Sequence, residues 1–292
     1  REGPIAQIGG SIGSFVAQLF RLESRLKLLV ACGAAAGIAT TFNAPIGSVM
    51  FAQEILLQGK VELAHFSLIV ISTATAVIAS RAIGGTETIF HAVTFDLGGY
   101  HEIPTYAAMG LLLGLLAAFY VRLFHATIER VTRSRLGTAT KLVGGLVIVG
   151  LVGIALPQNL SDGYPVINEA LAGELSARLM IALAVAKIVT SCISLAAGAP
   201  GGVFGPIFFI GAMTGGAFRS LSAWAFPGYT GPHGSYALVG LATFLGACTH
   251  APLTAVFLLF ETTGSYEIAL PALVTVILAL IVASTIEPES ID

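Results

Sequence analysis

The stretch GAPGGVFGP at residues 198–206 lies inside a run, residues 188–218, that contains no Asp, Glu, Lys or Arg. Residues 28–53 and 220–260 form two more runs of this kind. A helix that crosses a bilayer needs about 20 mostly apolar residues, so each run can hold one or two membrane segments. The glycines and prolines of the stretch would break such a helix, and broken backbone at membrane depth is tolerated only where protein buries it or water reaches it. Short, interrupted segments therefore indicate the binding site of a transporter.

The composition supports a membrane location. Of the 292 residues, 55% are hydrophobic and 10% are charged, whereas a soluble domain usually carries about 25% charged residues. The mean hydropathy is +0.89. We therefore predict an integral, multi-pass protein of the lipid bilayer, located in the cell membrane. The formal net charge of −2 and the lack of a basic stripe argue against nucleic acid as a partner.

Apolar segments follow one another with short breaks, and we predict that all of them are helices. They cover residues 4–20, 28–42, 45–57, 64–84, 104–128, 141–157, 178–196, 203–222, 233–248, 251–263 and 268–285. Longer polar breaks lie at 85–103, 129–140 and 158–177, and none is long enough for a separate domain. The sequence therefore predicts a single all-α transmembrane domain over residues 1–292. The arginines of the middle break place it on the cytoplasmic side.

Two blocks of sequence recur in the same order. Gly3-Pro4-Ile5 matches Gly205-Pro206-Ile207 at an offset of 202 residues, and Ala44-Pro45 matches Ala251-Pro252 at an offset of 207. Two ordered matches of this kind indicate an internal duplication. Duplicated halves in a membrane protein are typical of a pseudo-two-fold architecture with the substrate at the interface.

The duplication places part of a first repeat in residues 1–130 and a second repeat in about 141–292. It sets Glu2 opposite Phe204, each at a Gly-Pro helix start. Such starts would point free N–H groups and positive dipole ends at one region, which makes an anion site. The alternative is that glycines at these starts only let helices pack closely.

At these residues the sequence resembles the CLC family of chloride channels and chloride/proton antiporters. The resemblance covers essentially the whole chain, and its motifs are long and correctly ordered. They are Arg1-Glu2-Gly3-Pro4, the GAAAG and FNAP motifs at 33–37 and 42–45, the opening stretch at 198–206, and APLT at 251–254.

The resemblance implies a CLC-like inverted-repeat bundle of tilted and broken helices that passes chloride or a similar small anion. Glu2 falls where the family has its gating glutamate, whose carboxylate occupies an anion site and swings aside. Backbone groups of the two helix starts would hold the anion; these residues are Gly3, Gly202, Val203, Phe204 and Gly205. The family is homodimeric, and the segments at its subunit interface correspond to 45–84 and 251–285.

Two departures from the family concern the ends of the sequence. The first filter motif, a Gly-Ser-Gly-Ile-Pro run, would lie upstream of Arg1, and a tyrosine of the final pore helix would follow Asp292. The sequence therefore resembles a fragment of a full pore, and we expect that it does not conduct by itself.

A third departure concerns the mechanism. Antiporters of the family commonly carry an inner glutamate that passes protons from the cytoplasm, and the matching position here is Ile55, with Glu54 one residue earlier. Isoleucine cannot take up a proton. We therefore predict a voltage- or pH-gated chloride channel, with a chloride/proton antiporter or a fluoride-type variant as the alternatives.

Other ionisable residues have structural interpretations. We expect Glu54 and Glu261, at matched positions of the repeats, to hydrogen-bond to backbone or to pair with other groups. Lys187 and Arg219 lie in apolar stretches and either add positive potential near the pore or extend to an interface. His250 is expected to be packed or interfacial.

The remaining polar and aromatic residues give no sign of an enzyme. Tyr164 and Trp224 are interpreted as interfacial aromatics, and the three cysteines as small core residues. The six histidines are scattered, so we predict no metal site and no cofactor. A membrane enzyme would need a clustered nucleophile, base or metal set.

Overall fold

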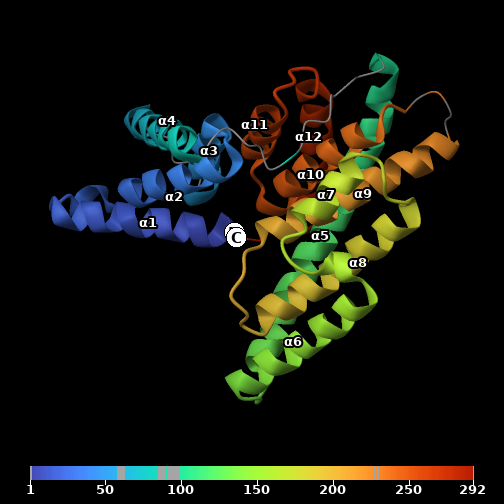
Figure 1. Cartoon of the computed structure of the whole chain (residues 1–292), viewed down its shortest axis with the longest axis horizontal. Helices are drawn as coiled ribbons and strands as arrows, with labels where there is room; N and C mark the ends of the chain where they lie inside the picture. The colour runs from blue at the N-terminus through green and yellow to red at the C-terminus, as the bar shows by residue number, and fades with distance from the viewer. Residues whose placement is uncertain are drawn as a thin grey trace.

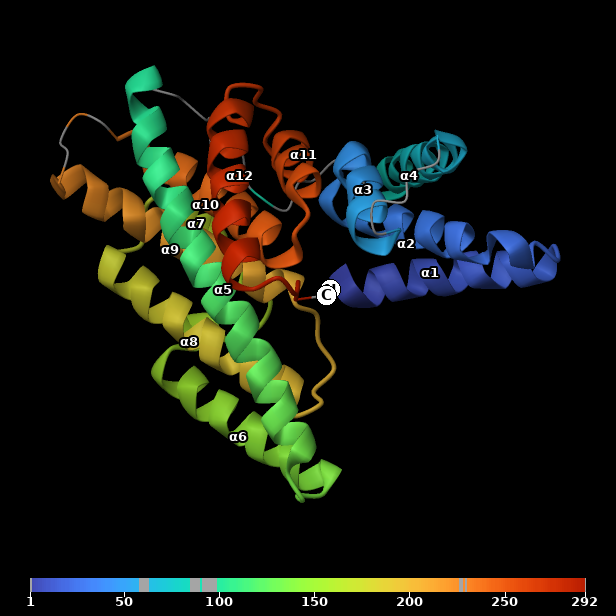
Figure 2. The ribbon, with the colours of Figure 1, turned by 180° about the vertical axis from the view of Figure 1, so that it is seen from behind.

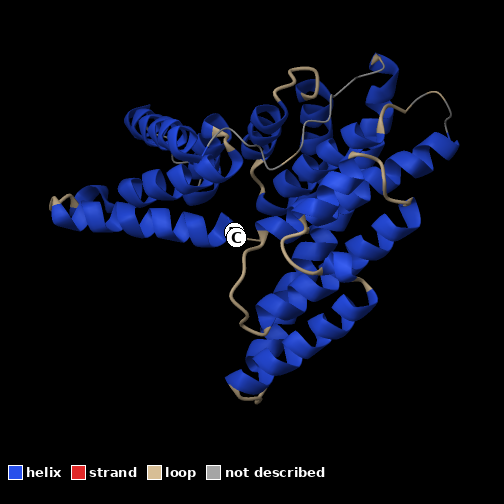
Figure 3. Cartoon of the chain, in the orientation of Figure 1, coloured by secondary structure: helices blue, strands red, loops and turns tan. Residues whose placement is uncertain are grey.

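The computed structural model describes residues 2–57, 63–84, 90, 99–225, 228 and 230–291. The described residues form α-helices and no strand (Figure 3). The helices are α1 (Glu2–Leu19), α2 (Leu26–Phe42), α3 (Pro45–Phe51), α4 (Leu63–Gly84), α5 (Ile103–Arg133), α6 (Thr138–Ala155), α7 (Tyr164–Leu171), α8 (Ala177–Ala196), α9 (Phe204–Ala225), α10 (His233–Thr249), α11 (Pro252–Thr263) and α12 (Ala269–Ile286). Short 3-10 turns lie at Glu23–Arg25, Tyr100–Glu102 and Pro157–Asn159, and a π-helical turn lies at Ala52–Leu56.

The helices coincide with the predicted apolar segments, with two differences. Helix α5 continues to Arg133, into the predicted break at 129–140, and α7 lies inside the predicted break at 158–177. Helix α7 has only 8 residues and follows a stretch of Ser, Asp and Gly, so its apolar face is too short to stand out in the sequence. Most of the predicted break at 85–103, like Arg1, lies outside the described residues.

The chain is an integral membrane protein of the all-α class. Within the part of the chain that the structure describes, six stretches are long and apolar enough to cross a membrane. They are Glu23–Phe42, His65–Gly84, Tyr100–Arg133, Thr138–Ala155, Ala177–Ala196 and Ala269–Ile286. Helices α3 and α11, with 7 and 12 residues, are too short to cross it. Their ends therefore lie within the protein, as expected for a bundle of broken helices.

The helices form two groups (Figures 1 and 2). Helices α1 to α4, in blue and cyan, extend to one side, and α5 to α12 form a larger group around α10. Every residue of α10 from Gly234 to Thr249 is buried, so this helix is the centre of the core. The groups meet where α3 packs against α11 and where the N-terminal end of α1 reaches α9.

Repeat-related glycines make equivalent contacts in the two groups. A Cβ atom on Gly9 of α1 would lie 2.1 Å from the carbonyl oxygen of Gly33 in α2, and a Cβ atom on Gly211 of α9 would lie 2.6 Å from that of Gly240 in α10. Neither contact leaves room for a side chain. These positions are related by the offsets of 202 and 207, so the repeat seen in the sequence is also a repeat of helix crossings.

The short helices of the two repeats cap each other. Glu54 accepts hydrogen bonds from the N–H groups of Leu253 (3.0 Å) and Thr254 (2.7 Å) at the start of α11. Glu261 accepts them from Ile46 (2.9 Å) and Gly47 (2.6 Å) at the start of α3. The offset of 207 relates both the carboxylates and their donors. The structural interpretation of both glutamates is therefore confirmed.

Both short helices also follow the same turn. Asn43 and His250, which the offset of 207 relates, adopt left-handed backbone conformations with φ values of 54° and 52°. Each ends the preceding long helix and lets the chain reverse into α3 or α11. His250 is thus part of a packed helix junction, as expected.

The predicted boundary between the repeats stays a prediction. Helix α5 falls almost entirely within the range 1–130, yet it packs against α8, α10 and α12 of the larger group.

We predict that Glu54→Ala and Glu261→Ala destabilise the protein to a similar extent. Each substitution leaves two N–H groups of a partly buried helix start without an acceptor, which costs about 1–3 kcal/mol. Thermal unfolding in detergent, followed by size-exclusion chromatography, would show a lowered midpoint for both variants. Glu129→Ala is the control, because Glu129 makes an exposed pair with Arg133 and should change the midpoint little. Midpoints equal to that of the control would contradict the capping role.

Candidate anion site

The N-terminal ends of α1 and α9 lie against each other at the junction of the two groups. A Cβ atom on Gly3 would be 3.6 Å from the Cα atom of Gly202, so the two backbones are neighbours with no side chain between them. Gly3 follows the first residue of α1, and Gly202 lies just before α9. The structure therefore brings together the two helix starts that the sequence analysis related to each other.

The start of α9 presents backbone donors to this junction. The first N–H groups of a helix have no acceptor within it, and in α9 these belong to the turn that includes Phe204 and Gly205. The next residue, Pro206, has no N–H group, as is common in a first turn. The centre of the Phe204 ring lies 5.7 Å from the ring centre of Phe51 and 6.3 Å from that of Phe208, so aromatic side chains pack beside the junction.

Glu2 begins α1 and is 2% exposed. One of its carboxylate oxygens accepts a hydrogen bond of 2.5 Å from the hydroxyl of Tyr164. Tyr164 is the first residue of α7 and is 4% exposed. The interpretation of Tyr164 as an interfacial aromatic is therefore wrong: it is buried beside the predicted gate. Trp224, by contrast, is 84% exposed near the end of α9.

A family model described as "Voltage gated chloride channel" matches residues 1–284. The chain belongs to the CLC family. The H(+)/Cl(-) exchange transporter ClcA of Klebsiella pneumoniae subsp. pneumoniae is 31% identical over 290 residues, which cover 97% of this chain and 61% of that protein. The putative chloride channel protein ClcB-like of Ralstonia nicotianae is 33% identical over 288 residues, which cover 97% of this chain and 67% of that protein.

Solved structures of CLC proteins resemble this chain along its whole length. A slow cyanobacterial Cl-/H+ antiporter superposes with a TM-score of 0.88 at 27% identity, covering 99% of this chain and 69% of the other. A CLC-type fluoride/proton antiporter gives a TM-score of 0.86 at 22% identity, covering 100% and 71%. That second likeness shows the fold alone.

A buried lysine holds the loop that positions Tyr164 in this CLC chain. Lys187 of α8 is 5% exposed, so it does not extend to an interface. Its ammonium group donates hydrogen bonds to the carbonyl oxygens of Asn159 (3.0 Å) and Ser161 (2.9 Å). Its nitrogen also lies 4.9 Å from the ring centre of Phe209. Lys187 therefore anchors the segment that runs into α7.

Arg219, the other basic residue that the sequence analysis found in an apolar stretch, makes its contacts at the start of α10 and not at the loop before α7. Arg219, near the end of α9, donates to the carbonyl oxygen of Gly231 (2.9 Å) and contacts a ring nitrogen of His233 (2.7 Å). These contacts join α9 to the start of α10 and explain why an arginine is tolerated there.

Ile55, the residue predicted to match the family's inner glutamate, lies on a π-helical turn. Ile55 belongs to the π-helical turn Ala52–Leu56, is partly buried and packs against the main core. Its neighbour Glu54 turns away to cap α11. Helix α11 of the other repeat has no such distortion. Single π-helical turns often occur at functional sites, and this one includes Ile55, which the sequence analysis predicts to match the family's inner acid.

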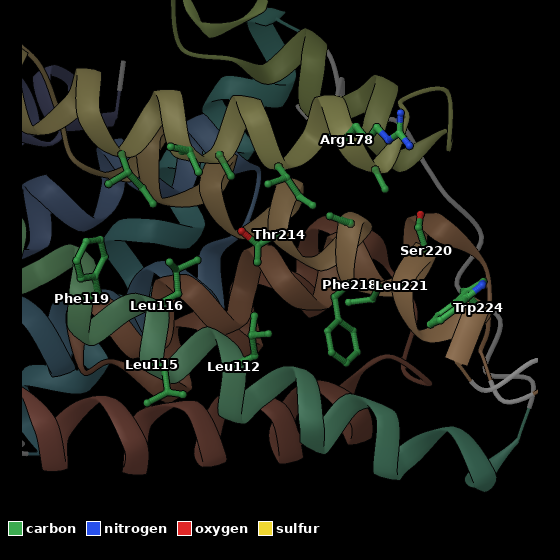
Figure 4. A pocket seen from close by; sticks show the side chains of 16 residues that line it. Leu112, Leu115, Leu116, Phe119, Arg178, Thr214, Phe218, Ser220, Leu221 and Trp224 are labelled. Atoms are coloured by element: carbon green, nitrogen blue, oxygen red, sulfur yellow. The ribbon is translucent and has the colours of Figure 1, made fainter.

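A groove of about 930 Å³ on another side of the chain is not part of this site. It runs between α5, α8 and α9 and is lined mainly by apolar side chains such as Leu112, Leu115 and Phe119 (Figure 4). Arg178 and Ser220 are among its few polar residues. The lining of this groove is apolar, as is the hydrocarbon of a bilayer. Its few polar residues do not form a cluster of hydrogen-bond donors that could hold an anion.

We predict that Gly163→Ala perturbs the loop before Tyr164 more than backbone strain alone would. Gly163 has a φ of +83°, and a Cβ atom there would lie 2.4 Å from a ring carbon of Phe209. Gly264→Ala is the matched control, because Gly264 has a φ of +65° but open space around a Cβ atom. Thermal midpoints in detergent should fall in both variants and fall further for Gly163→Ala. Equal losses would show that the contact with Phe209 is unimportant.

Proposed function

We propose that this chain takes part in the exchange of chloride, or a similar small anion, for protons across a membrane. The observation that carries the proposal is the junction of two helix starts with one buried carboxylate, Glu2, at the point of contact. Oriented N–H groups and positive helix ends attract an anion strongly where the dielectric is low. An ionisable residue at such a place is a functional candidate.

The names of the relatives favour exchange over a channel. The Klebsiella protein is named an exchange transporter and the cyanobacterial structure is that of an antiporter. The alternative from the sequence analysis is thus better supported than the channel that Ile55 favoured. The channel remains the second candidate, because a branched apolar side chain at position 55 cannot carry a proton and because the Ralstonia relative is named a putative channel.

In the proposed mechanism, Glu2 competes with the transported anion. The deprotonated carboxylate is itself an anion and occupies the junction, and its protonation removes the charge that keeps it there. Backbone N–H groups of Gly3, Val203, Phe204 and Gly205 would then hold the transported ion instead. Chloride needs only donors and positive potential, so backbone groups are sufficient.

We also propose that the chain forms a homodimer through the faces of α3, α4, α11 and α12. Apolar side chains on these helices are exposed, among them Ile71 (60%), Ile78 (67%) and Ile281 (56%). The predicted interface segment 45–84 includes residues 58–62, which lie outside the described part of the chain.

The proposed exchange is tested with the full-length protein in liposomes. An imposed chloride gradient should drive protons against their own gradient, measured as a change in external pH. Glu2→Gln, which mimics a permanently protonated gate, should keep anion flux while proton movement and pH dependence disappear. Chloride flux without proton movement in the unmodified protein would instead support the channel. Unchanged pH dependence in Glu2→Gln would remove Glu2 from the mechanism.

We predict that anion binding depends on the backbone at the start of α9 and not on its side chains. Val203→Ile keeps the N–H group and should change chloride affinity little. Phe204→Pro removes one donor and restricts the preceding residue, so it should abolish binding. Isothermal titration calorimetry measures both, and size-exclusion chromatography shows whether each variant is folded. Binding that survives in a folded Phe204→Pro variant would place the anion elsewhere.

A further inference from the structure

We propose that Tyr164 is a latch that holds Glu2 in its closed position, and that Lys187 sets the position of this latch. The inference rests on the proposed gating role of Glu2 and adds to it two residues from the other repeat. Tyr164 touches the gate directly, whereas Lys187 acts through the loop before α7 and is a positioning residue.

The contact between Tyr164 and Glu2 has the features of a strong hydrogen bond. It is 2.5 Å long and links two side chains that are 4% and 2% exposed. A hydroxyl that donates to an ionised carboxylate makes a shorter and stronger bond than one between neutral groups. Burial strengthens it further because water does not compete for either partner. The bond therefore holds the ionised carboxylate in the closed position more firmly than it would hold a neutral carboxyl group.

The loop before α7 leaves Tyr164 little freedom. Lys187 binds two carbonyl oxygens of this loop, and the side-chain amide of Asn159 donates to the hydroxyl of Thr190 at 3.0 Å. Both anchors come from α8. The ring of Phe209 lies so close to Gly163 that a side chain at position 163 would not fit. The ring of Phe90 lies 5.8 Å from the Tyr164 ring. A phenol held in this way can fix the position of the carboxylate that it binds.

Few charged groups compete for control of Glu2. Asp162 lies in the anchored loop, and one of its carboxylate oxygens accepts from the Tyr164 N–H at 3.4 Å. The charged residues of the elements packed against α1 are Glu23 and Arg25 of the adjoining 3-10 turn, Lys27 at the start of α2 and Arg219 near the end of α9, and α7 carries Glu169. Those of the 3-10 turn and α2 lie at the opposite end of α1, and Arg219 binds the start of α10. Tyr164, which contacts the Glu2 carboxylate directly, is thus placed to influence when Glu2 leaves.

The first test compares the pH dependence of chloride flux in liposomes for the full-length protein and three variants. Tyr164→Phe removes the hydroxyl and keeps the ring, so the pH of half-maximal flux should rise by about one to two units. Tyr106→Phe is the matched control, because Tyr106 is also buried and its hydroxyl has no hydrogen-bond partner in the part of the chain that the structure describes; its profile should equal that of the unmodified protein. Glu2→Gln should abolish the pH dependence.

These variants separate the latch from the gate. A Tyr164→Phe profile equal to that of the unmodified protein, with pH dependence lost in Glu2→Gln, would overturn the latch and leave the gate intact. Persistence of pH dependence in Glu2→Gln would overturn the proposed gate, and with it the latch.

The second test concerns Lys187. Lys187→Met should raise the pH of half-maximal flux, and Lys187→Arg should raise it less. In a variant that already carries Tyr164→Phe, Lys187→Met should cause no further rise. An additive shift in the double variant would show that Lys187 acts by another route. If Lys187→Met does not fold, Thr190→Val loosens the same loop by removing the acceptor of Asn159, and the same comparison applies.

Discussion

Broken helices inside a membrane leave backbone N–H groups that must find acceptors, because hydrocarbon offers none. This chain meets the constraint in two ways. The starts of α3 and α11 are closed permanently by the carboxylates of Glu261 and Glu54. The starts of α1 and α9 face each other across Gly3 and Gly202, and the carboxylate there belongs to Glu2, the residue that we propose as a movable gate. The same interaction thus holds the two repeats together at one place and forms the proposed anion site at another.

The two repeats differ at the residues of the proposed site. At the matched helix starts, Glu2 in one repeat corresponds to Phe204 in the other, so only one of the two starts carries an anionic side chain. Near the ends of the matched short helices, Ile55 lies on a π-helical turn and its counterpart Thr262 lies on a regular α-helix. Glycine crossings, left-handed turns and capping glutamates, in contrast, are kept in both. The repeats therefore share their packing contacts and differ in the residues of the proposed site.

The sequence predicts the long helices and a structural role for Glu54 and Glu261 because both depend on local or repeated patterns. Uncharged runs mark a membrane helix wherever it packs, and the matched positions of Glu54 and Glu261 indicated a shared structural role. Tyr164 was misinterpreted because its partner is 162 residues away and its own helix has 8 residues. Lys187 binds carbonyl oxygens of the backbone, which no side-chain pattern marks. The one available signal was Gly163-Tyr164-Pro165, a further helix start marked by Gly and Pro beside the two that form the site.

The capping contacts also limit how a proton can reach Glu2. Glu54 is adjacent to Ile55, the predicted match to the family's inner acid, but its carboxylate accepts two N–H bonds and a hydroxyl bond at the start of α11. If Glu54 carried protons, it would have to release these donors, and the contact between the repeats would lose one of its two caps. Ile55 has no titratable group. Neither residue can therefore donate protons to Glu2 while the cap on α11 stays in place. In the proposed exchange, proton coupling therefore requires water beside Ile55, and we expect the hydration of that turn, not a second carboxylate, to distinguish exchange from simple conduction.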